Sequence, residues 1–540
     1  MRWRHIGGLS SIVLSGTMGL LISASGCRTP QRYVTAAPPR PLKAAPIEDP
    51  KIPLPDPLAA DVPPGYRVEV VASGLTFPSS IEFDDSGTMY IAEAGYVCGD
   101  IAAPARVMRV EKDGRIEVVA DQLNGPITDL LWHGGQLYIS HRGKVSVLVG
   151  NEVQDIVTGL PSLGDCQNNQ ISAGPDGKLY VGQGTASNSG VVGVDNYVFG
   201  WLGKHPNVHD LSPFALELRE TQFESLNPLK LSTDKEKLNA VTGPFQPFGQ
   251  SGATIIRGTV RANGTILRFN PDGSGLEVYA WGLRNPFGVA WGLDGILYVT
   301  EDGYDDRGSR PIANAPDVVW QITQDAWYGF PDFAGGVPVT DPQFKPAKGP
   351  APEFLLKHHP RRGEKPLAKL PPHSGVGKMD FSRSSQFGFE GQMFVAEVGD
   401  MKPITGKGNG HAGYQVVRID LTTGETTPFF RTRAAMLGAR PLEYVSTSGP
   451  KRPVDVRFSR ESDALYVADL GAVMVYQSAT PAPRPFAGSG VIWRISRETI
   501  QPGFPIGISF VPGRVNTAIG GAGTVSGVQS GGATGVAKKF

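Results

Sequence analysis

The chain has 540 residues with 51 basic and 51 acidic side chains, so its formal net charge is zero. This balance argues against the basic surface of nucleic-acid-binding proteins and against a polybasic membrane patch, so no nucleic-acid partner is expected. The 69 glycines and 46 prolines suit a turn-rich β architecture.

The first 26 residues have the layout of a secretory signal peptide. Two arginines precede an apolar run at residues 12–22, and small residues follow before Cys27. The run is shorter than the ~20 residues of a membrane-spanning helix. Residues 24–27 resemble a bacterial lipobox, the motif in which a signal peptide ends before a cysteine that becomes lipidated. We therefore expect an exported protein, periplasmic or outer-membrane, with a lipid anchor on Cys27; export without an anchor is the alternative.

The segments that flank the repeats have biased compositions. Residues 27–64 are rich in proline and are predicted to form an extended tether. Residues 497–540 are rich in Gly, Ser, Thr and Val without a period, which predicts a disordered tail. Between them, residues 65–496 are predicted to form a single large domain.

One hairpin pattern recurs six times in that domain. Each copy contains an apolar strand, a turn, and a second strand with a central Tyr or Phe that ends close to a glycine. In the third copy Pro175 and Gly177 suit the positions of a tight turn that need a fixed and a positive φ, respectively. The copies are residues 81–95, 130–143, 168–184, 289–303, 379–399 and 456–471.

Short strands recurring in this way predict an all-β fold, a six-bladed β-propeller with one hairpin in each blade. A β-sandwich is the alternative, although it does not require one hairpin repeated with the same aromatic residue. The long segments at residues 185–261 and 338–372 are predicted to be inter-blade insertions that lie over a face and shape access to it.

The repeat also predicts where a site lies. In every hairpin the turn is at one end, so the loop leading into the first strand and the end of the second strand meet at the other. A propeller gathers these six incoming loops and six outgoing ends around one mouth of its channel. Polar residues that converge there predict a binding site, although each of them could instead cap a strand. Arg284 beside Asn285 indicates an anionic ligand.

Residues 164–193, 280–311, 327–333 and 452–471 resemble the soluble quinoprotein glucose/sorbosone dehydrogenases, with a closer likeness to the sorbosone dehydrogenase-like branch. The most specific piece is GLRNPFG at residues 282–288. The resemblance implies a six-bladed propeller with pyrroloquinoline quinone (PQQ) and Ca²⁺ at the channel mouth. It also implies hydride transfer from a sugar or sugar aldehyde, with the electrons then passing to an external acceptor.

The resemblance assigns residues to the cofactor and to the metal. Arg284 and Asn285 match the family's Arg-Asn pair, which suits the carboxylates of the quinone, and Arg452 matches a second arginine. The carbonyls of Gly303 and Tyr304 fall where the family supplies Ca²⁺ ligands. Asp302, Asp305 and Asp317 are hard oxygen donors nearby, or else belong to a solvated loop.

Cys166 stands where the family has the histidine that acts as the general base. An ordinary thiol, with a pKa of about 8.5, is a poor base, and a disulfide with Cys98 would remove it altogether. Either another group has taken the role or the oxidation has been lost. The candidates on the mouth are His373, Asp455, Asp129 and His141.

Two functions of other classes remain open. The first is a Ca²⁺-dependent lactonase-type hydrolase, which requires side chains such as Glu93, Asn168 and Asp455 to point at one metal. The second is a non-catalytic propeller that binds carbohydrate or protein through the mouth. A mouth filled by the insertion at residues 185–261 would favour this last alternative.

Overall fold

The computed structural model describes residues 50–95, 103–111, 113–230, 238–406, 411–438, 444–475 and 483–498. The predicted signal peptide, Cys27 with most of the tether, Cys98, and the tail from residue 499 lie outside these residues. Within the described ranges, no helix combines the length and apolar character that crossing a bilayer requires.

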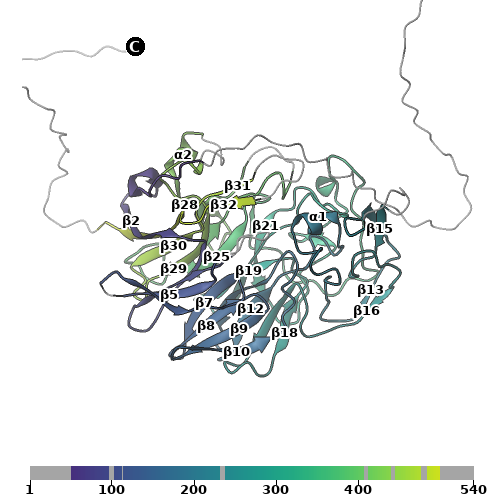
Figure 1. Cartoon of the computed structure of the whole chain (residues 1–540), viewed down its shortest axis with the longest axis horizontal. Helices are drawn as coiled ribbons and strands as arrows, with labels where there is room; N and C mark the ends of the chain where they lie inside the picture. The colour runs from purple at the N-terminus through teal and green to yellow at the C-terminus, as the bar shows by residue number, and fades with distance from the viewer. Residues whose placement is uncertain are drawn as a thin grey trace, which may run out of the picture. The chain divides into compact units, whose positions relative to one another are not determined.

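Six antiparallel sheets form the blades of a β-propeller, which confirms the predicted fold class (Figure 1). The innermost strand of each blade contacts those of the two neighbouring blades, so the six strands enclose one central channel. The sheet of the last blade contains strands from both ends of the domain. There β2, near the start, pairs with β33, near the end, and Tyr66 lies opposite Arg497. This pairing closes the ring.

The strands of the six blades, from the innermost outward, are as follows. Blade 1 contains β3 (Pro78–Phe83), β4 (Met89–Glu93), β5 (Arg106–Val110) and β6 (Ile116–Ala120); blade 2 contains β7 (Ile127–His133), β8 (Gln136–His141), β9 (Lys144–Val149) and β10 (Glu152–Thr158). Blade 3 contains β11 (Asn168–Ala173), β12 (Leu179–Gln183), β17 (Thr265–Phe269) and β18 (Glu277–Trp281); blade 4 contains β19 (Pro286–Trp291), β20 (Leu297–Glu301), β21 (Asp317–Ile322) and β24 (Ala368–Leu370). Blade 5 contains β25 (Val376–Phe381), β26 (Met393–Glu397), β27 (Gln415–Ile419), β28 (Thr426–Thr432) and β1 (Ala60–Asp61); blade 6 contains β29 (Pro453–Phe458), β30 (Ala464–Asp469), β33 (Gly490–Arg497) and β2 (Tyr66–Leu75).

The recurring hairpins form the two innermost strands of the six blades. Their aromatic residues pack across the interface between one blade and the next, which explains why the repeat requires a large ring at this position. Tyr138 lies in one hydrophobic cluster with Leu179 of the following blade. The other five aromatics contact a ring of the next blade in the pairs Tyr90–Trp132, Tyr180–Trp291, Tyr298–Phe381, Phe394–Phe458 and Tyr466–Phe83.

The two long insertions lie within blades, and their predicted inter-blade position was wrong. Residues 184–264 connect the second and third strands of blade 3, and residues 323–367 connect the third and fourth strands of blade 4. The error arose because the outer strands repeat less regularly than the inner hairpins, so the sequence did not show that each insertion is followed by a further strand of the same blade. The insertions contain α1 (Val194–Val198), β13 (Leu216–Glu217), β14 (Phe223–Leu226), β15 (Asn239–Thr242) and β16 (Ile255–Ile256), and then β22 (Phe333–Ala334), β23 (Val337–Pro338) and η3 (Pro342–Phe344).

Short elements elsewhere extend the blades. The 3-10 helix η1 (Pro57–Ala59) leads into β1, so residues 57–61 of the predicted tether contact the edge of blade 5. The helix α2 (Arg433–Met436) follows β28, and the hairpin of β31 (Val473–Val475) and β32 (Pro483–Pro485) precedes β33.

Polar side chains join neighbouring innermost strands around the channel axis. In each case a side chain of one blade accepts a hydrogen bond from a backbone N–H group of the next blade. Because these groups are buried, leaving the N–H group without an acceptor would destabilise the fold. The bonds are Leu130 N to Ser80 Oγ (3.1 Å), Ile171 N to Asp129 Oδ2 (3.0 Å), Val289 N to Gln170 Oε1 (2.9 Å), Phe458 N to Asp380 Oδ2 (2.9 Å) and Ile81 N to Asp455 Oδ2 (2.8 Å).

Lys378 lies at the axis with its side chain fully buried. Its Nζ is 2.9 Å from Asp129 Oδ1 and 3.1 Å from Asp455 Oδ2. It also donates to the carbonyls of Ser79, at 2.6 Å, and Thr128, at 3.0 Å. Asp129 and Asp455 were predicted at the mouth as candidate bases. They instead form this buried ion cluster, because each lies within an innermost strand, β7 or β29, with its side chain directed to Lys378 at the axis.

Replacement of Lys378 tests how much this ion cluster contributes to the stability of the fold. Lys378→Met removes the cation nearest to two buried carboxylates and leaves only Arg457, 3.9 Å from Asp129, so we expect the free energy of unfolding to fall by about 3–5 kcal/mol. Lys369→Met, at an exposed position of β24, is the control. Guanidinium denaturation of both variants measures the effect, and equal midpoints would show that the cluster does not stabilise the ring.

Candidate functional site

A cavity of about 280 Å³ lies at the channel mouth, and incoming or outgoing segments of all six blades line it. This volume is near the lower end of the roughly 300–1,000 Å³ of small-molecule sites. The cavity also receives Phe199, from the insertion in blade 3. Of the predicted site residues, Cys166, His373, Arg284, Asn285, Gly303 and Asp317 line it, whereas Arg452, Tyr304 and Asp455 do not.

Arg284 and Asn285 are held in the cavity wall by other polar side chains. Nη2 of Arg284 is 3.1 Å from Asp305 Oδ2. Asn285 donates from Nδ2 to Asp302 Oδ2 at 2.7 Å and accepts at Oδ1 from Asn169 Nδ2 at 2.9 Å. The pair therefore presents one guanidinium and a fixed amide to the cavity, although the chain's own carboxylates balance the charge of the guanidinium.

Asp305 lies at the centre of an ion network that sequence reasoning did not resolve. Its Oδ2 accepts from Arg284 and, at 2.9 Å, from Nε of Arg307. Arg307 also contacts Asp165 at 2.7 Å and Asp195 at 2.6 Å. Burial disfavours the charged form of Asp305, but the two guanidinium groups outweigh it and lower its pKa.

Arg307 joins the insertion to the cavity. Its Cζ is 4.2 Å from the centroid of the Phe199 ring, the distance of a cation–π contact. Because Asp195 and Phe199 belong to the insertion and Asp165 to an incoming loop, Arg307 links three segments. No spacing in the sequence indicates this contact, since Arg307 lies in an irregular loop far along the chain from the residues it binds.

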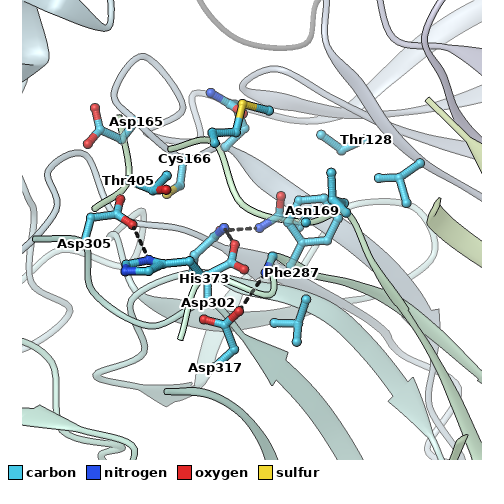
Figure 2. A pocket seen from close by; sticks show the side chains of 18 of the residues that line it. Thr128, Asp165, Cys166, Asn169, Phe287, Asp302, Asp305, Asp317, His373 and Thr405 are labelled. Carbon is cyan, nitrogen blue, oxygen red and sulfur yellow. Dashed lines mark hydrogen bonds and ion pairs between the residues drawn. The ribbon is translucent and has the colours of Figure 1, made fainter. Parts of the chain in front are cut away.

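The imidazole of His373 points toward Asp305 (Figure 2), and its ring lies next to Gly406. Its Nδ1 is 3.3 Å from Asp305 Oδ1. Burial lowers the pKa of His373, but the hydrogen bond and charge of Asp305, with a smaller contribution from Asp317, outweigh burial and raise it. The residue has a φ of 65°, a left-handed conformation that non-glycine residues adopt rarely and often at functional sites.

Cys166 also lines the cavity, but its chemistry differs from that of a base. Its thiol is free and buried. Burial raises its pKa to about 12, and the nearby Arg284 offsets this only in part. Cys166 is therefore a neutral thiol at physiological pH and is not suited to accept a proton.

Two further residues of the predicted set have their side-chain polar groups occupied elsewhere. Arg452 donates to the carbonyls of Val398 and Gly399, both at 3.1 Å, and stacks on Tyr414. It therefore supports the cavity wall from behind. The hydroxyl of Tyr304 donates to the Phe333 carbonyl at 3.1 Å.

The remaining candidate base and the hydrolase side chains do not converge on the cavity. His141 accepts from Asn124 N and lies 2.8 Å from Ser146 Oγ; burial lowers its pKa to about 4. Glu93 accepts from Thr76 N and pairs with Arg106 at 2.6 Å. The side chain of Asn168 forms hydrogen bonds with residues of blade 2 and with Ser162 of its own incoming loop. The three-ligand metal centre of the lactonase alternative is therefore not assembled.

The Asp302–Asp317 side of the cavity is suited to a cation. Oδ1 of Asp302 is buried and accepts no hydrogen bond from the described residues. Burial and the nearby Asp317 raise the pKa of Asp302 well above its ordinary value. A divalent cation would satisfy this oxygen and relieve the repulsion.

Both carboxylate oxygens of Asp317 already accept hydrogen bonds. Its Oδ1 accepts from Gly303 N at 2.8 Å, and its Oδ2 accepts from Ser374 Oγ at 2.9 Å and Gly375 N at 2.8 Å. In the described chain, no three His, Cys, Asp or Glu side chains come together as a metal site. A cation at Asp302 would therefore need carbonyl, water or ligand oxygens to complete its coordination.

The charges of the cavity lining indicate how the quinone could bind. Five aspartates line the cavity beside two arginines, and both arginines are already paired. Such a lining repels an isolated tricarboxylate but suits one bound together with a cation. The buried hydroxyl of Thr405, which also accepts and donates no hydrogen bond among the described residues, adds a free donor. The residues thus fit the quinone together with a cation.

Among known proteins, the chain is similar to quinoprotein dehydrogenases. No family model matches the chain. The chain is 26% identical over 185 residues to quinoprotein glucose dehydrogenase B of Acinetobacter calcoaceticus, a match that covers 34% of this chain and 29% of the relative. The chain thus matches less than a third of that relative's length. The resemblance to soluble quinoprotein sugar dehydrogenases is confirmed, while the sorbosone dehydrogenase-like branch stays a prediction.

Among solved structures, the chain matches PQQ-binding domains at low sequence identity. The holo PQQ domain of pyranose dehydrogenase from Coprinopsis cinerea is 16% identical with a TM-score of 0.49, covering 83% of this chain and 98% of that one. PQQ-bound aldose sugar dehydrogenase from Streptomyces coelicolor is 16% identical with a TM-score of 0.44, covering 81% and 100%.

The raised pKa of Cys166 predicts an unreactive thiol. At pH 8, a pKa of about 12 leaves a thiolate fraction on the order of a thousandfold below that of an ordinary cysteine. We expect iodoacetamide to label the Cys166 peptide of the folded protein more slowly by that order, as followed by mass spectrometry. The same peptide in guanidinium chloride is the control. Equal rates in the two conditions would contradict the buried, neutral thiol.

Proposed function

We propose that the chain is an oxidoreductase that oxidises a sugar or sugar aldehyde, with PQQ and a divalent cation bound in the mouth cavity. The observation that carries this proposal is the joint presence of the Arg284–Asn285 pair and the His373–Asp305 pair in one cavity. The first pair suits the carboxylates of the quinone, and the second suits removal of a proton from a substrate hydroxyl. The sequence match to a quinoprotein glucose dehydrogenase supports the same class.

In this proposal His373 takes the role that Cys166 cannot perform. When bound, the quinone supplies the hydride acceptor. His373 in its neutral form accepts the hydroxyl proton, while Asp305 orients the imidazole and stabilises the imidazolium that results. Arg284 and Arg307 keep Asp305 ionised, so the two arginines act on the base indirectly.

Asp302 and the carbonyls of Gly303 and Tyr304 are the proposed cation ligands of this chain. Asp317 is better described as a support, because both its oxygens already accept hydrogen bonds. Arg452 likewise supports the cavity wall. A cavity remains beside Phe199, so the insertion narrows the mouth without filling it. This favours an enzyme over the non-catalytic alternative.

The cellular setting is proposed from the sequence. The signal-peptide layout and Cys27 support an exported protein, periplasmic or attached to the outer membrane by a lipid. The electrons then pass to an external acceptor.

Reconstitution tests the proposed cofactors. The protein from residue 28 onward is expected to bind PQQ in calorimetry only when Ca²⁺ is present, because the cavity lining is acidic. Arg284→Ala should weaken binding by about 10–100-fold through loss of charge-assisted bonds. Arg257→Ala, outside the cavity lining, is the control. Tight binding in the presence of EDTA would contradict the role of the cation, and no binding with Ca²⁺ would overturn the proposed cofactor.

The pH dependence tests His373 as the base. A base must be neutral to accept a proton, and the pKa of His373 is raised, so kcat of the reconstituted enzyme should rise with pH above about 6.5. His373→Asn should remove this limb and lower kcat by about 10²–10⁴-fold. His358→Asn, on a side chain that is 83% exposed, is the control. An unchanged profile in His373→Asn would assign the proton to another group.

A further inference from the structure

In three blades, the acidic residue that ends the second strand accepts a hydrogen bond from a backbone N–H group of the incoming loop. In blade 1, Glu93 Oε1 accepts from Thr76 N at 2.7 Å. In blade 4, Glu301 Oε1 accepts from Arg284 N. In blade 6, Asp469 accepts from the N–H groups of Lys451 and Arg452, both at 2.7 Å. The donors Thr76, Arg284 and Lys451 each lie two residues before the proline that begins the first strand.

Blade 5 has the same acid but does not use it in this way. Glu397 ends β26, and its buried Oε1 has no hydrogen-bond partner among the described residues. The equivalent donor is Ser374, two residues before β25 begins, but its N–H group donates to the Pro371 carbonyl at 3.2 Å. Burial raises the pKa of Glu397 to about 8, so its carboxyl is protonated far more readily than that of an ordinary glutamate.

Backbone bonds from Val398 N and Gly399 N to the Gly375 and Ser374 carbonyls, both at 2.8 Å, join the incoming loop to blade 5 itself, but the carboxylate that binds this loop comes from blade 4. Asp317, the first residue of β21, accepts from Ser374 Oγ at 2.9 Å and from Gly375 N at 2.8 Å. The loop changes direction at His373, whose φ is 65°. A non-glycine residue is strained in this conformation, so the surrounding contacts must hold it there.

The turn of the blade 5 loop at His373 places the imidazole between Asp305 and Gly406. On one side is Asp305, 3.3 Å from Nδ1. On the other is Gly406, where an added Cβ would lie 2.8 Å from His373 Nε2. Gly406 does not have the positive φ of many glycines in this chain, so the space taken by the imidazole accounts for the missing side chain.

We propose that attachment of the blade 5 loop to Asp317, rather than to Glu397, holds His373 in the cavity, with Asp317 and Gly406 as positioning residues. This inference deepens the proposed function and rests on it for the role of His373 in turnover. The placement of the imidazole itself is independent of turnover and can be measured without any cofactor.

The direct test follows His373 by NMR in the cofactor-free protein. The chain has nine histidines, and the resonance missing from His373→Asn identifies the one of interest. In Gly406→Ala the added methyl group displaces the ring from Asp305, so its pKa should fall to or below the ordinary value of about 6.5. Gly203→Ala, an exposed glycine also without a positive φ, should leave the titration unchanged. An unchanged titration in Gly406→Ala would overturn the role of Gly406.

A second pair of variants tests the unusual attachment of the loop. Glu93→Gln weakens the hydrogen bond that the Glu93 side chain accepts from Thr76 N, so it should lower the denaturation midpoint. Glu397→Gln changes a carboxyl whose Oε1 has no donor among the described residues, so it should leave the midpoint unchanged. An equal loss in both variants would show that Glu397 does fasten the loop, which would overturn the proposed attachment to Asp317.

Turnover provides the readout that links the two proposals. In the reconstituted enzyme, Gly406→Ala should lower kcat at least about tenfold and leave KM nearly unchanged, because it misplaces a proton acceptor and removes no substrate contact. If the NMR titration shifts but kcat does not, the positioning of His373 stands and its proposed catalytic role fails. If neither changes, the positioning role fails.

Discussion

Hydrogen bonds between the innermost strands set the geometry on which the site depends. Five of the six blades supply an acceptor side chain to a backbone N–H group of the next blade, and Lys378 joins Asp129 to Asp455 across the axis. These groups are fully buried, so each needs its partner and permits few alternative arrangements. The Ser79 and Thr128 carbonyls that Lys378 also binds belong to residues that line the cavity. The ion cluster thus fixes the base of the cavity.

Charge balance determines what the cavity can hold. Its arginines are neutralised by aspartates of the same chain, and one oxygen of Asp302 has no hydrogen-bond partner within the described ranges. In a buried site an unpaired carboxylate is costly, which favours protonation or a bound cation. The same lining therefore favours a cation first and an anionic ligand only in its company. Arg307 extends this balance to the insertion through Asp195 and Phe199.

Cys166 and His373 show how two side chains of one cavity acquire different chemistry from their surroundings. Both are buried, and burial disfavours the charged form of each. Cys166 has only a partial offset from Arg284 and remains a neutral thiol. His373 has the ionised Asp305 at 3.3 Å and becomes more basic. The difference is a carboxylate within contact distance.

The sequence by itself determined the propeller, the number of blades and the location of the mouth, because strand periodicity, turn residues and an interface aromatic are local and repeat six times. It also identified Arg284, Asn285 and His373 as cavity residues. Only the tertiary structure decided which polar groups are free. Asp455 and Asp317 look like available donors in the sequence, yet contacts from other blades occupy them. Those contacts join residues far apart in the chain, and no local pattern encodes which partner a buried charge will meet.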